Sequence, residues 1–425
     1  MLRRSMGLVQ ATAMVVGIII GASIFVQPSE VSRHVSTIGA MFGVWTAAGV
    51  LSIAGAMVSA SLAAAFPKTG GVYIYLKETI SPAVGFLWVW AMFWSAHTGI
   101  IAAIAMVLAR YLSVLAPLND AGITLVAIGC IVLLSAINYA GVRAGSTVQT
   151  AFTIAKMAAI AAILVAVAVL AGPRPEAGVA ASAPGGPREF LLGISAGLFA
   201  FGGWHQVTYA AGETHRAEKT IPRALLVGMA IVTISYLSLN AAYLRVLPLS
   251  TVLHSQHIAA DAAAVLAGPR AAALVAILVI VSAFGGLSGT VLAGPRVYYA
   301  LAREGYAWRA LGQAHPRFQT PHIAIVAQGV WACALVATGT YRTLFTRVVY
   351  TEFLFFALMA IGLMRFEKRL TIAPLLFLLG CAVVVANQLA ADPREAAIGL
   401  LLVAAGLPVY YLFASRRPKP LPASE

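Results

Sequence analysis

The stretch GIIIGASIFV, residues 17–26, lies inside an apolar segment that is otherwise typical of one long helix. Glycine in a helix interior costs about 1 kcal/mol relative to alanine, so Gly17 and Gly21 weaken this helix where a lipid-facing span should be strong. Small residues at such a position have two readings. They either allow close packing against another helix or mark an unwound turn in the middle of the membrane.

The composition of the whole chain indicates a membrane protein. Of its 425 residues, 61% are hydrophobic and only 10% are charged, whereas a soluble domain carries about 25% charged residues. The net charge of +14 does not indicate nucleic acid, because lysine and arginine gather in alternate connecting loops. The apolar run after Arg3 and Arg4 continues past the length of a signal-peptide core, so we interpret it as an uncleaved first span.

Twelve apolar segments that could span a bilayer recur along the chain, which predicts an all-α membrane protein. With both termini in the cytoplasm, 18 of the 28 Lys and Arg residues face inward, 9 face outward and Lys156 lies within a span. This bias follows the positive-inside rule and predicts a multi-pass plasma-membrane protein, in bacteria the inner membrane, with both termini cytoplasmic. The expected spans lie near 8–34, 40–65, 83–115, 122–140, 146–171, 190–212, 222–247, 270–301, 322–339, 344–364, 371–390 and 396–414.

A second interrupted segment matches the first. The expected sixth span, GISAGLFAFGGWHQVTYAAGE at 193–213, carries Gly202 and Gly203 in mid-membrane. If the first ten spans form two repeats of five, the two interruptions occupy equivalent positions, which is a strong indication of a transporter binding site. The freed amides of an unwound turn suit a carboxylate and its freed carbonyls suit an ammonium group. Together the two stretches therefore favour an amino-acid site over simple helix packing.

Four motifs in order make the chain similar to the amino acid–polyamine–organocation (APC) transporters, and most similar to their L-type amino-acid transporter branch. The motifs are VVGIIIGASIFVQPSEV, AAAFPKTGGVYIYLKET, GLFAFGGWHQVTYAAGETHRAEKTIPRALLVG and LAGPRVYYALAREGYAWRALGQAHPRFQTP. The resemblance covers essentially the whole chain as a single transporter domain. It implies a LeuT-type five-plus-five inverted repeat with discontinuous helices 1 and 6, alternating access, and neither cofactor nor metal. Repeat one would be 8–171, repeat two 190–364, and two additional C-terminal helices would occupy 371–414.

The resemblance also implies a substrate site at the two interruptions. The substrate carboxylate is expected on the amides of residues 22–24, and its amine on the carbonyls of residues 19 and 20. In the sixth span the carbonyls of residues 199, 200 and 202 would take the amine, and Phe199 would be the gate that closes over the substrate. The predicted substrate-binding residues are Ile19, Ile20, Gly21, Ala22, Ser23, Ile24, Phe199, Ala200, Phe201, Gly202 and Gly203.

Lys156 is expected inside the fifth span, and a charge within a span is a functional candidate by default. By resemblance its ammonium stands where sodium-coupled relatives bind a cation, close to carbonyls near Gly17 and Ile18 and to polar groups of Ser282 or Ser288. This implies a sodium-independent permease or exchanger of α-amino acids, with neutral L-amino acids as the expected substrates. Two roles stay open for Lys156: it either carries a coupled proton or braces the helices as a fixed charge.

Three further polar residues are candidates for the pocket, and each has an alternative reading. Glu352, in the expected tenth span, either meets a cationic substrate or a proton, or reaches the outer interface to pair with Arg347 or water. His97 either lines the pocket or is a hydrogen-bonded core residue, and His205 either touches the pocket or bridges to a neighbouring span. Proton-coupled symport and transport of cationic amino acids or polyamines therefore remain alternatives.

Other classes of function have weaker support. The motif GLSG at 286–289 matches the nucleophile motif of rhomboid-type proteases, but the last four expected spans hold no histidine base beyond His322. The sequence contains no repeated acidic residues that would form the ring of a channel pore. A sensor built on a transporter fold is the remaining alternative.

The expected partners are the amino-acid substrate and the lipid bilayer. Eukaryotic members of the L-type branch are tethered to a heavy chain through a cysteine between spans three and four, and the corresponding loop here, APLNDAG, has none. Neither a disulfide-linked heavy chain nor a nucleic acid is therefore expected, and the missing cysteine fits a bacterial member of the branch.

Overall fold

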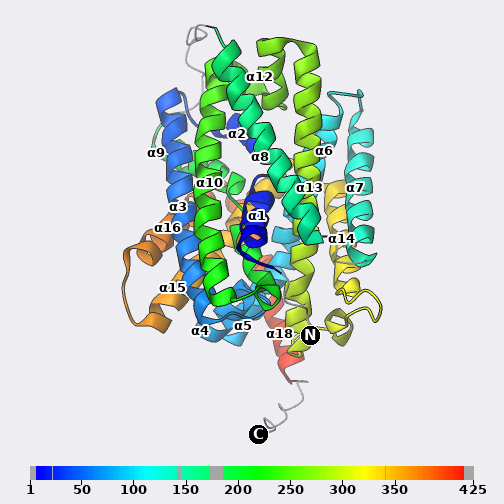
Figure 1. The fold of residues 1–425 in the computed structure, drawn as a ribbon. Coiled ribbons are helices and arrows are strands. Elements are labelled where there is room, and N and C mark those ends of the chain that lie inside the picture. The colour runs from blue at the N-terminus through cyan, green and yellow to red at the C-terminus, as the bar shows by residue number, and fades with distance from the viewer. Residues whose placement is uncertain (1–5, 22, 141–144, 173–184, 340, 416–425) are drawn as a thin grey trace.

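Helices make up nearly all of the chain, and the part of it that the structure describes contains no strand. In the computed structural model the long helices run side by side as an elongated bundle, with α1 near its centre (Figure 1). The first and last described residues lie at the same end of this bundle. The structure describes residues 6–21, 23–140, 145–172, 185–339 and 341–415, with side chains described throughout these ranges except at 145–149 and 341–351.

Capping residues set several boundaries in the first half of the chain. Thr37 begins the second long helix by accepting a hydrogen bond from the Ala40 amide at 3.1 Å, and Ser81 precedes a proline that occupies the first helical position after it. The elements of this half are α1 (Leu8–Ile19), η1 (Ser23–Phe25), α2 (Gln27–Ser32), α3 (Ile38–Ala65), α4 (Val72–Thr79), α5 (Pro82–Ala91), the π-helical turn η2 (Met92–Ala96), α6 (His97–Leu112), α7 (Asp120–Ala140) and α8 (Gly145–Leu170).

Glycine and proline punctuate the second half in the same way. Gly268, with φ +82°, ends one helix, and Pro269 opens the next at its first position. The elements are α9 (Pro187–Ala200), η3 (Trp204–Glu213), α10 (Ala217–Val246), α11 (Leu249–His254), α12 (Ile258–Ala267), α13 (Pro269–Arg303), η4 (Arg309–Gly312), α14 (His322–Thr338), α15 (Tyr341–Glu367), α16 (Ile372–Ala391), α17 (Pro393–Ala404) and α18 (Gly406–Ser415).

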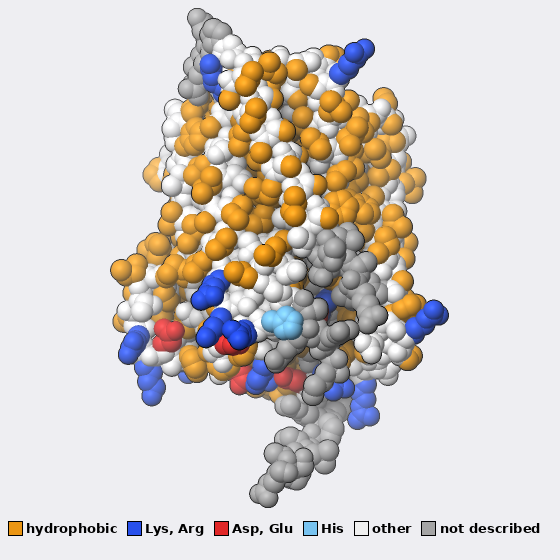
Figure 2. Space-filling model, in the orientation of Figure 1, with side chains coloured by type: hydrophobic (Ala, Val, Ile, Leu, Met, Phe, Trp, Pro, Cys, Tyr) orange, Lys and Arg blue, Asp and Glu red, His pale blue; other side chains and the backbone are white. Residues whose placement is uncertain are grey.

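Ten helical stretches of the described chain are long and apolar enough to cross a membrane. They correspond to the predicted spans apart from the ninth and tenth, where α14 has 17 residues and α15 has 27, some of them outside the described side chains. Large apolar side chains such as Leu125, Ile154 and Val169 are exposed on the outside. On the face seen in Figure 2, apolar side chains form a broad band and most Lys and Arg side chains lie at the end that holds the termini. This is the surface of a multi-pass membrane protein.

Several short helices stand where the sequence predicts connecting loops. Residues 249–267, between the predicted seventh and eighth spans, form α11 and α12, and α4 follows the second span. These helices have 6, 10 and 8 residues, whereas about 20 apolar residues are needed to span a bilayer. These helices are therefore too short to be predicted as spans.

The first and sixth predicted spans are both interrupted in the structure. Helix α1 ends at Ile19 and helical structure resumes at Ser23. Helix α9 ends at Ala200 and gives way, after Gly203 at φ +98°, to the 3-10 helix η3. A Cβ added to Gly203 would lie 2.7 Å from Cγ2 of Ile18, so the two interruptions lie against each other.

Candidate functional site

A cavity lies between the two helix interruptions, and its wall is mostly apolar. Aliphatic and aromatic side chains supply most of the lining, while a few polar groups come from five different elements. The lining residues are Ile18, Ile19, Ser23, Ser52, Ile100, Ile104, Leu198, Phe199, Gly202, Gly203, Trp204, Gln206, Thr290, Glu352, Phe353, Phe356 and Phe377. An apolar cavity with a few convergent polar groups is the usual form of a small-molecule site.

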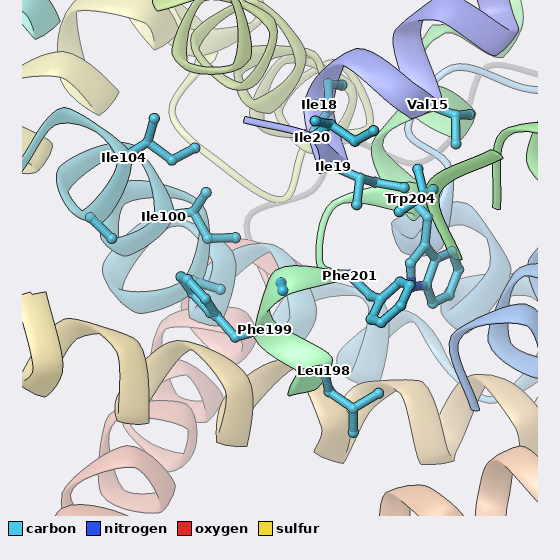
Figure 3. Packing of buried hydrophobic residues seen from close by; sticks show 14 of the residues in the cluster. Val15, Ile18, Ile19, Ile20, Ile100, Ile104, Leu198, Phe199, Phe201 and Trp204 are labelled. Atoms are coloured by element: carbon cyan, nitrogen blue, oxygen red, sulfur yellow. The ribbon is translucent and has the colours of Figure 1, made fainter. Parts of the chain in front are cut away.

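Phe199 and Phe201 point in different directions from the end of the sixth predicted span. The ring of Phe199 faces the α6 side of the cavity, toward Ile100 (Figure 3). Phe201 instead packs on the rings of Trp45 and Tyr236, with centroids 6.2 and 4.9 Å away. Phe199 is thus placed to cover a bound molecule, whereas Phe201 contributes to the support behind the site.

The predicted substrate-binding residues divide into those that line the cavity and those that do not. The lining members are Ile19, Ser23, Phe199, Gly202 and Gly203. The members outside the lining are Ile20, Gly21, Ile24, Ala200 and Phe201. Ala22 lies outside the described residues. Most of these residues lie at the ends of α1 and α9, where they present main-chain groups rather than side chains to a ligand.

Lys156, from α8, is buried with 3% of its surface exposed and makes three hydrogen bonds to main-chain carbonyls. Its Nζ donates to the oxygens of Gly17 at 2.9 Å, Ile20 at 2.8 Å and Ser282 at 3.3 Å. These contacts use all three donors of the ammonium group. Lys156 therefore connects the unwound end of α1 to α13, near the Gly17 and Ser282 partners that the resemblance implied.

Two details of the expected Lys156 site differ in the structure. The second carbonyl from α1 belongs to Ile20 rather than Ile18, because the chain unwinds after Ile19 and turns the Ile20 oxygen outward. Ser282, not Ser288, completes the set, and its hydroxyl donates to the Gly21 carbonyl at 2.9 Å. Gly17 and Ser282 thus hold Lys156 through backbone oxygens.

Glycines let α13 come close to this unwound turn. A Cβ added to Gly286 would lie 2.8 Å from the Cα of Gly21, which is backbone and cannot rotate away. The backbones of α13 and of the unwound turn after α1 are therefore in direct contact beside the Lys156 hydrogen bonds. Only glycine allows this approach at position 286.

Tyr236 of α10 links the two interrupted helices, and the sequence analysis did not identify it. Its buried hydroxyl lies 3.0 Å from the Ile19 oxygen and 2.8 Å from the Ala200 oxygen. Both carbonyls were expected to face the substrate amine, so this hydroxyl occupies the place of an ammonium donor. A buried tyrosine usually has a hydrogen-bond acceptor, but nothing in the sequence distinguishes Tyr236 from the other 13 tyrosines.

Replacing Tyr236 with phenylalanine is expected to lower the thermal stability and the amino-acid uptake of the protein. The change removes a donor from both carbonyls. The Ile19 oxygen still accepts from the Gly21 amide at 2.8 Å, but the Ala200 oxygen loses its Tyr236 partner, and an unsatisfied buried polar group costs about 1–3 kcal/mol. Thermal unfolding of the purified variant should begin several degrees below that of the wild type. A melting profile and uptake rate equal to those of the wild type would show that the hydroxyl does not support the two helix ends.

His97 is a hydrogen-bonded core residue and does not line the cavity. Its ring is fully buried, with Nδ1 3.3 Å from the Tyr298 hydroxyl and Nε2 3.1 Å from the Tyr209 hydroxyl. His205 also lies outside the cavity lining, but it stands directly behind Glu352. Neither ring nitrogen of His205 has a hydrogen-bond partner among the described residues, so its role as a bridge to a neighbouring span stays a prediction.

The structure gives the position of Glu352, whereas its pairing with Arg347 stays a prediction because the Arg347 side chain lies outside the described ones. Glu352 is 4% exposed, lines the cavity and lies with Oε1 3.9 Å from Nε2 of His205. Glu352 lies 11 residues, about three turns, after Tyr341 at the start of α15. The carboxylate therefore borders the cavity, where it could meet a cationic substrate or a proton.

Two ion pairs close the bundle at the end that holds the termini. Arg296 of α13 binds both oxygens of Glu213, at 2.8 and 3.1 Å, and Lys77 of α4 binds Glu304 at 2.8 Å. Burial acts to lower the pKa of Lys77, but the hydrogen bond and charge of Glu304 outweigh it and raise that pKa above its ordinary value. The two pairs connect η3 and α4 to α13 and to the residue that follows it.

The described residues contain no group of three or more His, Cys, Asp and Glu side chains that could hold a metal ion. The site so far consists of two unwound helix ends, a buried lysine on their carbonyls and an apolar cavity between them. The sequence model of the family described as amino acid permease matches residues 6–409. The chain belongs to the amino acid permease family. Members of this family transport amino acids across membranes, so the chain is a membrane transporter.

Individual members of the family resemble this chain along nearly its whole length. The serine/threonine exchanger SteT of Bacillus subtilis is 31% identical over 98% of each chain. The human cystine/glutamate transporter is 30% identical over 99% of this chain and 87% of its own. The human large neutral amino acids transporter small subunit 2 is 29% identical over 99% of this chain and 82% of its own. These permeases support the resemblance to the L-type branch.

Proposed function

We propose that this protein exchanges neutral L-amino acids across a cell membrane without sodium, by alternating access. The observation that carries the proposal is the cavity between two interrupted helices, with the main chain of both helix ends beside it and apolar side chains along most of its wall. Similarity to an exchanger of serine and threonine and to a transporter of large neutral amino acids supports this choice of substrate.

The proposed architecture has twelve spans, ten of them in two inverted repeats of five. Repeat one would cover 8–171 and repeat two 190–364, with α16 to α18 as the two additional C-terminal spans at 371–414. The interruptions after Ile19 and Ala200 would then be equivalent positions of the two repeats. The gathering of Lys and Arg at the end that holds the termini supports a cytoplasmic location for both termini.

The main chain of the two interruptions would recognise the parts shared by all α-amino acids. The amides of Ser23 and Ile24 open the short helix η1 and lack acceptors within it, so they suit the substrate carboxylate. The amine would approach the carbonyls at Ile19 and Gly202, with the Tyr236 hydroxyl releasing its bond to the first of them. Phe199 would then close over the ligand from the α9 side.

Lys156 would make the transport cycle independent of sodium. A cation bound between α1 and α13 would need the same carbonyl oxygens of Gly17, Ile20 and Ser282 that the ammonium group already occupies. We propose that Lys156 acts as a fixed substitute for that cation. It would hold the unwound turn in the shape that binds the substrate.

The transporter would work without a disulfide-linked partner. Cys130, Cys333 and Cys381 are free, and each lies within a helix of the bundle. No loop of the chain offers a cysteine to a second subunit. The partners are then the amino-acid substrate and the surrounding lipid.

Counterflow in proteoliposomes tests the proposed function. The purified protein would be reconstituted in sodium-free buffer, and uptake of labelled serine, leucine, glutamate and lysine compared in vesicles that contain unlabelled leucine and in empty ones. We expect rapid uptake of serine or leucine that depends on internal leucine. Equal uptake in empty vesicles would contradict exchange, and a need for external sodium would contradict the assignment of Lys156.

A further inference from the structure

A carboxylate in the lining of the cavity lies next to a buried imidazole. Glu352 of α15 lines the cavity, and His205 of η3 is fully buried beside it, with His205 Nε2 3.9 Å from Glu352 Oε1. Glu352 Oε1 and both ring nitrogens of His205 are buried and have no hydrogen-bond partner among the described residues. Buried polar atoms are seldom left in this state, so these three invite an explanation.

Aromatic rings enclose the imidazole and keep water from it. The rings of Trp88, Trp204 and Phe356 lie with centroids 5.7, 5.6 and 5.2 Å from that of His205, and the ring of His97 is stacked 6.2 Å away. Glu352, by contrast, borders the cavity. Among the described residues, the pair therefore borders the cavity through Glu352, while the imidazole is closed off.

Among the described side chains, the other titratable groups near the pair do not supply it with a counter-charge. Arg296 and Lys77 are held by their own carboxylates, and the Lys156 ammonium is bonded to carbonyls of α1 and α13. Among the described side chains of the elements packed around η3 and α15, the titratable groups against His205 are His97 of α6 and Tyr209 of η3. Tyr298 of α13 and Tyr75 of α4 lie behind them, next to His97 and Tyr209 respectively. A bare carboxylate with a neutral imidazole would therefore be an uncompensated negative charge.

We propose that Glu352 and His205 form a proton-binding site whose occupancy is linked to substrate binding in the adjacent cavity. One proton, taken from water, makes the pair neutral overall by forming either an O–H bond on Glu352 or an N–H bond on His205. When the substrate displaces water from the cavity, the lone carboxylate loses its solvation, which costs several kcal/mol for a buried ion, and the proton is retained. When the cavity is open to water, the pair returns the proton to solution.

The wall around Glu352 favours a proton over a cationic substrate group as its ligand. Phe353, Phe356 and Phe377 line the cavity on this side, and they offer no acceptor for the remaining hydrogens of an ammonium group. Gln206 also lines the cavity, and its Oε1 is a buried acceptor without a partner among the described residues, so it is the one side-chain acceptor of the sixth span in this lining that could help to hold an ammonium group. A proton needs no further acceptor, and His205 already stands where it can share one.

This inference rests on the proposed function, since it concerns the same cavity. The experiment measures the dissociation constants of L-leucine and L-serine for the purified protein between about pH 5 and pH 9, together with proton uptake on binding in weakly buffered solution. For the wild type we expect the dissociation constant to rise by up to about tenfold per pH unit on the alkaline side, because one proton is linked to binding. Glu352→Gln should bind with a constant that does not change with pH, and without proton uptake.

The matched control is Glu367→Gln, on the exposed end of the same helix, which should behave as the wild type. His205→Gln should also flatten the pH dependence, and infrared difference spectra should show on substrate binding either a protonated carboxyl band or an imidazolium band that Glu352→Gln lacks. Binding that is independent of pH in the wild type, or unchanged pH dependence in Glu352→Gln, would overturn the proposal. Loss of L-lysine binding in Glu352→Gln, with the pH dependence for L-leucine intact, would instead make Glu352 a receptor for cationic substrates.

Counterflow distinguishes a failure of the proposed proton site from a failure of the proposed function. If amino acids exchange but no proton is linked to their binding, only the role of the Glu352–His205 pair fails. If no neutral amino acid binds or exchanges, the proposed function fails and the linked proton site with it.

Discussion

Replacing Lys156 with methionine is expected to abolish exchange while leaving a folded protein. Methionine has a similar length and suits the apolar surroundings, but it removes the ammonium that holds Gly17, Ile20 and Ser282. Hydrogen bonds to a charged group contribute about 1.5–3 kcal/mol each, so losing even two of them should reduce transport by about a hundredfold or more.

The measurement is counterflow of labelled leucine, with size-exclusion and thermal unfolding profiles to show that the variant is folded. The variant should fold because the hydrogen bond from the Ser282 hydroxyl to the Gly21 carbonyl remains and still connects α13 to the unwound turn. Lys219→Met, at an exposed position of α10, is the matched control and should transport as the wild type does. Full activity in a folded Lys156→Met protein would remove the lysine from the transport mechanism.

The second large effect is expected for Gly286→Ala. The added methyl group would meet the Cα of Gly21 at 2.8 Å, so α13 or the unwound turn must move. Overpacking of this kind costs about 1–3 kcal/mol, and here the strain falls on the turn that carries the substrate site and the Lys156 contacts. We expect exchange to fall by at least about tenfold and thermal unfolding to occur at a lower temperature.

Gly129→Ala provides the control for this prediction. Gly129 lies on an exposed face of α7, and a Cβ there would meet nothing within 4 Å. Alanine should be tolerated at that position, because it is the better helix former. If Gly286→Ala matched Gly129→Ala in both transport and stability, close contact between α13 and the unwound turn would not matter.

The sequence points to the interruptions because glycine is costly in a helix interior and recurs at matching positions of the first and sixth spans. Gly21 and Gly203 stand where α1 and α9 give way to other structure. Membership of the amino acid permease family confirms the resemblance drawn from the four motifs. The short helices α11 and α12 escape prediction because their length falls below that of a span.

Contacts between distant segments could not be predicted in the same way. Tyr236 is one of 14 tyrosines, and only the fold shows that its hydroxyl reaches both helix ends. The depth of Glu352 depends on where α15 begins relative to the membrane, and its neighbour His205 lies 147 residues earlier in the chain. The directions of Phe199 and Phe201 follow from the local unwinding, which hydropathy does not describe.

A structure of the protein with a bound neutral amino acid, determined by electron cryomicroscopy, tests the central claim most directly. The account predicts that the substrate carboxylate lies about 3 Å from the amides of Ser23 and Ile24. Its amine should lie at the carbonyls of Ile19 and Gly202, beneath the ring of Phe199. A ligand bound elsewhere, with both helix interruptions free of it, would contradict the assignment of this cavity as the transport site.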